Sequence, residues 1–256
     1  MKITTLFSGS SGNCTLVECE NAKFLVDGGG SCKKICTALN ECGTSVDEIN
    51  AMFITHEHCD HVSALRVLLK KHKIPVYVKK KCAFASPLYE LISGNNIRCV
   101  ENELDEIIGG VRIIGFNVRH DSLGCFGYTF EENGVKAAVV TDIGKADGRV
   151  LEHLRGCGLA VLEANHDAVM VKNGPYPEDL KKRILSDSGH LSNENCALLV
   201  AELAKYGLRS VLLAHLSEEN NDPSVAEKTV KRAVCECGFD VEIKAAPRCS
   251  AESIEC

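Results

Sequence analysis

The sequence contains no tryptophan, and aromatic residues make up only 5% of its 256 positions. Proteins that hold single-stranded nucleic acids regardless of sequence usually stack the bases on aromatic side chains. Here only Tyr128 and Tyr176 are candidates for such stacking. The scarcity of aromatic rings argues against an extended stacking platform.

Positive charge and long apolar runs are also limited. Lysine and arginine number 29 against 35 acidic residues, so the formal charge is −6 and the pI is about 5.9. This balance excludes a generally basic nucleic-acid binder but not a local basic patch. No apolar run reaches the roughly 18 residues of a membrane span, and no signal-peptide pattern follows Met1-Lys2-Ile3. We expect a cytoplasmic protein without a membrane segment.

Cysteine, in contrast, is abundant. The chain has 15 cysteines, an odd number, and none of them form the paired Cys-x2-Cys arrays of zinc ribbons. We interpret them as reduced, small and mostly buried hydrophobic residues, as is typical of cytosolic proteins.

Short apolar runs and helical patterns are mixed along the whole chain. Strands are predicted at residues 2–7, 14–19, 23–26, 51–55, 75–78, 97–100, 111–118, 127–130, 136–141, 159–162 and 210–213. Helices are predicted at residues 31–42, with Ser31 as N-cap, and at 61–72, 148–154, 178–185, 193–206 and 224–235. Asn133-Gly134 is a strong hairpin signal. The pattern has no long linker, and it predicts one α/β (α+β) domain over residues 1–256, with two packed sheets and helices outside.

The most informative segment is His56-Glu57-His58-Cys59-Asp60-His61. It lies between an apolar strand and a helical pattern, in a turn where side chains can converge. Imidazoles and a carboxylate suit Zn²⁺, Mn²⁺ or Fe²⁺. His56 and His58 are two residues apart in extended chain and can point to the same side, whereas Asp60 and His61 enter the helix and can face a second ion. Cys59 should point away from the metals, and we assign it no role.

Three further candidates, His120, Asp142 and His215, each follow a predicted strand. Taken singly, a loop histidine is more often structural, and an aspartate after a strand is more often a turn or N-cap residue. Taken together, they complete the set, because two four-coordinate ions need roughly eight ligand positions. A carboxylate such as Asp142 can bridge both ions.

At this point the sequence resembles the metallo-β-lactamase-fold metallohydrolases, over nearly the whole chain. The resemblance implies a four-layer αββα sandwich of two mixed β-sheets flanked by helices. It also implies a binuclear site in which Asp142 bridges the two ions. The other implied ligands are His56, His58 and His120 for the first metal, and Asp60, His61 and His215 for the second.

Further motifs resemble the YycJ/WalJ branch, which is related to tRNase Z and to phosphodiesterases. These motifs are Ser8-Gly9-Ser10-Ser11-Gly12-Asn13, Glu163-Ala164-Asn165-His166-Asp167, Gly189-His190-Leu191-Ser192-Asn193 and His215-Leu216-Ser217 with Asn220-Asn221. Members of this branch are associated with 5′→3′ exonuclease activity on DNA. In tRNase Z-like enzymes a Glu pairs with a His of a Gly-His-Ser type turn, and Glu163 and His190 match these positions. A carboxylate beside an imidazole raises its pKa and orients it as a general acid.

Several residues are weaker candidates. The small-residue turn could present N–H groups and hydroxyls to a phosphate, or could be a plain hairpin turn. Its side chains and one further asparagine form the candidate substrate-binding set: Ser8, Ser10, Ser11, Asn13 and Asn193. Asp27 is either a hydrogen-bond partner of a ligand histidine or a turn aspartate, and His166 lies either behind a ligand or merely near the site. The basic runs at 70–73 and 79–81 are either solvated faces or steer a polyanion.

The resulting prediction is a binuclear metal-dependent phosphodiesterase, most specifically a 5′→3′ DNA exonuclease, with two Zn²⁺ or Mn²⁺ ions (Fe also possible). Asp60, His190 and Glu163 are the predicted catalytic residues, Asp60 as a metal ligand. One alternative is a hydrolase of another small substrate on the same site, such as a cyclic phosphodiester, a thioester or a lactone. Another is a metal-holding binding protein without turnover, although the complete ligand set argues against it. The chain is too short for a β-CASP insertion, and His58 in place of Glu disfavours the flavo-diiron reductases.

Overall fold

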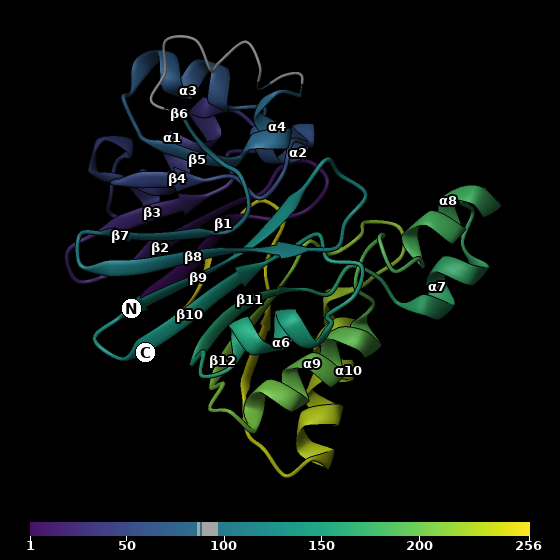
Figure 1. The fold of residues 1–256 in the computed structure, drawn as a ribbon. Coiled ribbons are helices and arrows are strands. Elements are labelled where there is room, and N and C mark those ends of the chain that lie inside the picture. The colour runs from purple at the N-terminus through teal and green to yellow at the C-terminus, as the bar shows by residue number, and fades with distance from the viewer. Residues whose placement is uncertain (86–87, 89–96) are drawn as a thin grey trace.

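The computed structural model describes residues 1–85, 88 and 97–256, and in it two seven-stranded sheets pack face to face (Figure 1). The first sheet contains β1 Lys2–Phe7, β2 Cys14–Glu18, β3 Lys23–Val26, β4 Ala51–Phe53, β5 Val76–Lys79, β6 Ile97–Val100 and β14 Glu252–Glu255. The second contains β7 Leu104–Ile108, β8 Val111–Val118, β9 Cys125–Glu132, β10 Val135–Val140, β11 Leu159–Glu163, β12 Ser210–Ala214 and β13 Glu242–Ala245.

Each sheet is antiparallel on one side and parallel on the other. In the first, the order is β14-β1-β2-β3-β4-β5-β6, and the strands are parallel from β3 onward. In the second, the order is β13-β12-β11-β10-β9-β8-β7, and the strands from β10 to β13 are parallel. The predicted pair of mixed sheets is confirmed. The Asn133-Gly134 turn joins β9 to β10 with φ angles of 51° and 78°, as a tight hairpin turn requires.

The few aromatic residues are concentrated between the two sheets. Phe53 of β4 lies 5.4 Å from Tyr128 and 5.8 Å from Phe130, both of β9, measured between ring centroids. Tyr128 is fully buried, and its hydroxyl donates to the Ile54 carbonyl at 2.7 Å. Its expected role in base stacking is therefore wrong: the ring belongs to the core, where its hydroxyl needs a buried acceptor.

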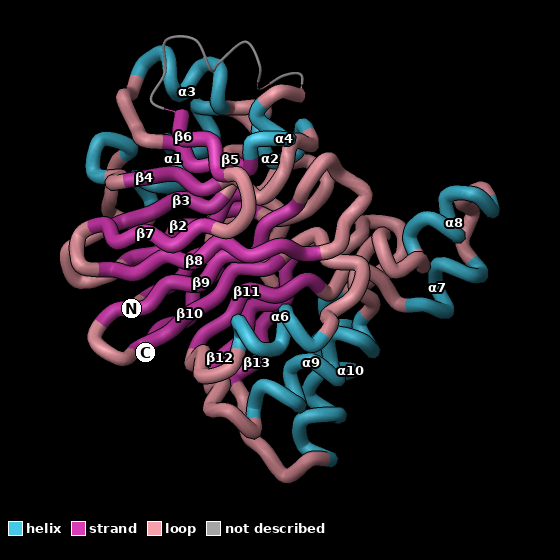
Figure 2. The backbone as a smooth tube through the Cα atoms, viewed as in Figure 1, coloured by secondary structure: helices cyan, strands magenta, loops and turns pink. Residues whose placement is uncertain are grey.

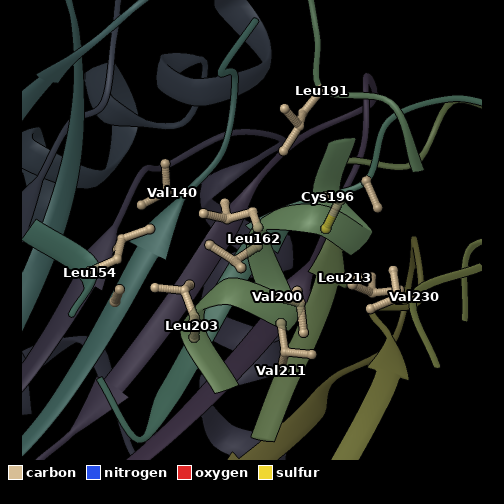
Figure 3. Packing of buried hydrophobic residues seen from close by; sticks show 14 of the residues in the cluster. Val140, Leu154, Leu162, Leu191, Cys196, Val200, Leu203, Val211, Leu213 and Val230 are labelled. Carbon is tan, nitrogen blue, oxygen red and sulfur yellow. The ribbon is translucent and has the colours of Figure 1, made fainter. Parts of the chain in front are cut away.

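Helices cover the outer face of each sheet. The first sheet carries α1 Cys32–Glu41, α2 Cys59–Val62, α3 Leu65–Lys71 and α4 Lys80–Ala83, and a short 3₁₀ helix spans Val46–Glu48. The second carries α6 Gly148–Leu154, α9 Asn193–Ala204 and α10 Pro223–Glu236. Figure 3 shows Val200 and Leu203 of α9 packed near Leu162 and Val211 of the sheet. The predicted αββα layering is confirmed.

The predicted helix over residues 61–72 is instead two helices, α2 and α3, with a break at Ser63-Ala64. The carbonyl of Asp60 accepts the Asn13 N–H at 2.8 Å and the carbonyl of His61 accepts the Gly28 N–H at 2.7 Å. These carbonyls are therefore used by neighbouring loops. The helix is interrupted where the turn over residues 56–61 is tied to the loops of the first sheet.

The sequence prediction missed the strands β7, β13 and β14 and the helices α4 and α7 Ala168–Asn173. Each of the three strands is an edge strand of its sheet. Their polar sequences lack the apolar runs of central strands. Helix α7 and α8 Glu178–Ile184 form an arm that projects away from the body (Figure 1). The two chain ends lie close together (Figure 2), because β1 pairs with β14.

Two composition-based expectations can be compared with the structure. All fifteen cysteines are free, but only six are buried and six are exposed, so the expectation that most are buried is wrong. Among the described residues, no helix is long and apolar enough to cross a membrane.

Candidate metal centre

The predicted metal ligands, together with Asp27 and Glu163, lie where strands end. Each follows or closes a strand at its carboxyl end, where open α/β sheets place functional groups. The positions are Asp27 after β3, His56 to His61 after β4, His120 after β8, Asp142 after β10, Glu163 at the end of β11 and His215 after β12. Both sheets therefore contribute to one site.

The turn that carries four of the ligands is locked between two other loops. Asn13 and Gly28 donate their N–H groups to the carbonyls of Asp60 and His61, and the Gly29 N–H bonds to the Asn13 carbonyl at 2.9 Å. A Cβ on Gly29 would lie 1.8 Å from the Asp60 carbonyl oxygen. Only glycine permits this approach, so Gly29 is required by the predicted ligand turn beside it.

Six of the seven predicted ligands form two adjoining groups. His56, His58 and His120 form one, and Asp60, His61 and His215 form the other; in each group the candidate ligand atoms lie within 4.8 Å of one another.

Asp142 lies between these two groups. It groups with His56 and His61 on one side and with His215 on the other. Its buried carboxylate is the one positioned to face both groups.

The histidine rings are oriented so that one nitrogen remains free. The Nδ1 atoms of His56, His120 and His215 lie 3.0 Å from Thr55 Oγ1, 3.1 Å from the Gly189 carbonyl and 2.8 Å from Glu163 Oε1. Their Nε2 atoms are buried and have no hydrogen-bond partner, and the same holds for Asp142 Oδ2.

Each such unsatisfied buried atom would cost about 1–3 kcal/mol. Both groups therefore contain buried imidazole nitrogens without partners, and with the Asp142 oxygen these are suitable donors for divalent cations. The residues present fit a binuclear metal site.

The electrostatics of the site also favour a cation. Burial lowers the pKa of His56 well below its ordinary value, and neighbouring His61 and His120 add to this effect, so His56 is neutral and able to ligate. Burial also lowers the pKa of His215, but Asp142 and two further carboxylates outweigh it and raise that pKa to about 10. Without metal, imidazolium balances the buried carboxylates; a bound cation would take over that role.

Three site residues have a left-handed backbone, which costs non-glycine residues about 1–3 kcal/mol. Asp27, Asp142 and His215 have φ angles of 63°, 55° and 57°. Among the described residues, the only other non-glycine case is Asn133 of the hairpin turn. The strained positions therefore coincide with strand ends that must aim a side chain at the site.

Glu163 holds two histidines at once. Its Oε1 lies 2.8 Å from Nδ1 of His190 and 2.8 Å from Nδ1 of His215. Its Oε2 accepts the N–H groups of Ile143 at 2.8 Å and Leu191 at 3.1 Å. Burial raises the pKa of Glu163, but His190 and His215 outweigh it and hold that pKa well below its usual range. The carboxylate is therefore charged and rigidly placed.

His190 is less enclosed than the ligand histidines, with 21% of its side chain exposed. Burial lowers its pKa, but the Glu163 carboxylate outweighs this and raises it above the ordinary value. No described residue bonds its Nε2. The predicted Glu163–His190 pair is therefore in contact. Glu163 lies at the Nδ1 edge of the ring, and the Nε2 edge is directed away from it.

Asp27 also contacts a ligand. Its Oδ2 lies 2.7 Å from His61 Nδ1, and its Oδ1 accepts the Thr55 N–H at 2.8 Å. The Thr55 hydroxyl donates to the same carboxylate and reaches His56. Sequence reasoning missed Thr55, although its position directly before the ligand segment was a usable signal.

The candidate substrate-binding residues separate into two classes. Ser10 and Ser11 are exposed, and Ser10 lines a cavity of about 180 Å³ together with His190 and His215. Ser8 is buried, and its hydroxyl accepts the His215 N–H at 2.7 Å. Asn13 is buried beside Asp60 and His61. Ser8 and Asn13 therefore support ligands.

The expected substrate contact of Asn193 is wrong, and of the two alternatives for His166 the structure favours a position merely near the site. Asn193 has no exposed surface, and it exchanges two side-chain hydrogen bonds with Asn221, at 2.8 and 2.9 Å. It cannot contact substrate and instead joins α9 to the loop before α10. His166 contacts Asn165 rather than a ligand, and it lines a second cavity of about 590 Å³ that also reaches His190.

Comparisons with known proteins agree with this geometry. Residues 24–216 match the beta-lactamase superfamily domain. The chain is 34% identical over 245 residues to an exodeoxyribonuclease YycJ of Bacillus anthracis, covering 94% of this chain and 92% of that protein. It is 33% identical over 248 residues to an exodeoxyribonuclease WalJ of Streptococcus pneumoniae, covering 95% and 92%. The crystal structure of Zn²⁺-bound PqqB from Methylobacterium extorquens superposes with a TM-score of 0.73 at 13% identity, covering all of both chains.

Proposed function

Because the chain belongs to the metallo-β-lactamase superfamily and is a metallohydrolase, we propose that it is a two-metal phosphodiesterase that degrades DNA from the 5′ end. The observation that carries this proposal is His190, a histidine oriented by Glu163 beside the seven-ligand cradle. Hydrolysis of a phosphodiester expels an alkoxide, which needs a proton. The exodeoxyribonuclease relatives support DNA as the substrate.

Zn²⁺ or Mn²⁺, with Fe²⁺ as a further option, suits the nitrogen and carboxylate donors, and the zinc-bound structural neighbour is consistent with zinc. Two ions held by the seven ligands would supply an activated water and neutralise phosphate charge. His56, His58 and His120 would hold one ion. Asp60, His61 and His215 would hold the other, and Asp142 would contact both.

The remaining chemistry falls to the protein's own groups. His190 donates its Nδ1 proton in a hydrogen bond to Glu163, which fixes the ring plane and leaves Nε2 to protonate the leaving 3′-oxygen. Glu163 stabilises the charged imidazole before transfer. The same carboxylate fixes His215, so the proton donor and a metal ligand are held in register by a single group.

The test is His190→Ala, with His166→Ala as matched control, because His166 lines the same larger cavity and does not contact Glu163. We expect His190→Ala to keep its metal content and to lose about 10²–10⁴-fold in DNA turnover. The loss should shrink on bis(p-nitrophenyl) phosphate, whose nitrophenolate leaves without protonation. His166→Ala should behave like the wild type on both substrates.

Labelled DNA distinguishes the finer claims. Release of label first from 5′-labelled strands supports the polarity, whereas release first from 3′-labelled strands contradicts it. Wild-type turnover of DNA by His190→Ala would contradict the proton-donor role. Activity on a thioester or lactone panel with none on DNA would replace the phosphodiesterase by the alternative hydrolase.

A further inference from the structure

Two cavities meet at His190, and they differ in the charge of their walls. The larger, about 590 Å³, includes the carboxylates of Asp147, Asp187 and Glu202, and the one lysine or arginine among its described lining residues, Lys145, is paired with Asp187 at 3.0 Å. This lining repels a phosphate. The smaller cavity, about 180 Å³, is lined by ligand His215, by His190 and by Arg183. A polyanionic backbone is better accommodated on the Arg183 side.

Arg183 comes from the projecting arm and reaches back to the metal centre. It lies in α8, and its Nε donates to Asp121 Oδ2. The other oxygen of Asp121 lies 3.2 Å from Nε2 of the predicted ligand His120. The Asp121 carboxylate therefore lies between the Arg183 guanidinium and Nε2 of His120.

The position of Arg183 allows its carboxylate partner to be exchanged for another anion. Its side chain is 58% exposed, whereas that of Asp121 is 26% exposed. The guanidinium group binds carboxylates and phosphates alike, and a carboxylate oxygen of Asp121 already occupies a place where a phosphate oxygen would bind. Tyr176 and Ser10 line the same cavity.

We propose that Arg183 is a substrate-binding residue that releases Asp121 and binds the DNA phosphate next to the scissile one. This inference rests on the proposed function and adds the element that distinguishes a polynucleotide from a small phosphodiester. The α7–α8 arm thereby serves to place a cation at the mouth of the site.

The chain offers a matched control in the next residue. Lys182 carries the same charge on the same helix, but its side chain is 78% exposed, pairs only loosely with Asp179 at 3.9 Å, and does not line the cavity. Arg183→Ala, Arg183→Lys and Lys182→Ala should be compared in metal content, thermal unfolding and steady-state kinetics. The substrates are single-stranded DNA and bis(p-nitrophenyl) phosphate, which has no second phosphate.

Arg183→Ala should raise the KM for DNA about 10-fold or more, as expected for loss of a charge-assisted hydrogen bond, with kcat within about twofold. The slope of log K for DNA binding against log salt concentration should become shallower by about one unit, the contribution of one phosphate contact. Arg183→Lys should recover part of the affinity, because the charge remains without the fork. Lys182→Ala should match the wild type, and all variants should hydrolyse the small diester normally.

Equal KM values and salt slopes for Arg183→Ala and Lys182→Ala would overturn the inference. A matching loss on the small diester would also overturn it, because Arg183 would then act on the scissile phosphate or position His120. Failure of the proposed function has a different signature: the wild type itself would not hydrolyse DNA.

Discussion

The two sheets contribute to the metal centre in different ways. The first sheet delivers four predicted ligands in one six-residue turn after β4, held by two loops through backbone hydrogen bonds and a glycine contact. The second sheet delivers one functional side chain per strand end, at β8, β10, β11 and β12. There one shared carboxylate, Glu163, braces both His190 and His215.

The difference shows two physical solutions to one problem. A dense turn is positioned by close backbone packing, so its geometry depends on the absence of a side chain at the contact. Dispersed ligands are positioned by shared hydrogen bonds, so their geometry depends on charged partners. Substitutions in the first half should therefore act on folding and metal loading, and those in the second half on catalysis.

The largest effect is expected from Gly29→Ala. Its Cβ would overlap the Asp60 carbonyl at 1.8 Å and the Asn13 nitrogen at 2.5 Å, and both are backbone atoms that can move only with their loops. We expect a loss of about 3 kcal/mol or more in unfolding free energy, with loss of bound metal. Denaturant unfolding and elemental analysis measure these two quantities.

Gly28→Ala is the control for that substitution. Its Cβ would meet the Leu65 side chain at 3.1 Å rather than backbone, so the cost should stay below about 1.5 kcal/mol. If Gly29→Ala were as stable and as fully metallated as Gly28→Ala, interlocking of the loops would not explain how the turn is held.

The next comparison pairs the two carboxylates that brace histidines, one from each half. Glu163→Gln should lower DNA turnover about 10²–10³-fold even at saturating metal, because it disturbs both His190 and His215. Among the proposed ligands and the proton donor, Asp27 contacts only His61, so Asp27→Asn should weaken metal affinity by about 10–100-fold and recover most turnover when metal is added. Metal titrations followed by kinetics separate the two outcomes.

Full rescue of Glu163→Gln by metal would show that Glu163 acts only through His215. Failure of metal to rescue Asp27→Asn would show that Asp27 has a role beyond loading. Either result would remove the contrast between the two halves.

Much of the fold and of the site could be predicted because the signals are local. The segment from His56 to His61 is dense, and the apolar runs before Asp142 and His215 mark strand ends. Helix boundaries such as α6 were also readable, since Gly148–Leu154 shows helical spacing.

The rest depended on contacts between distant segments. Asn193 looked exposed because it begins a helix after a polar turn, yet Asn221, 28 residues away, buries it. The break between α2 and α3 depends on carbonyls taken by Asn13 and Gly28. The Arg183–Asp121 pair spans 62 residues. Neither periodicity nor spacing carries such information.

The most direct test of the account is the number of metal ions bound per chain. The seven proposed ligands, in two groups with Asp142 between them, predict two Zn²⁺ or Mn²⁺ ions per purified and reconstituted wild-type chain, measured by elemental analysis against protein concentration. One ion per chain at saturation, or none, would contradict the binuclear centre.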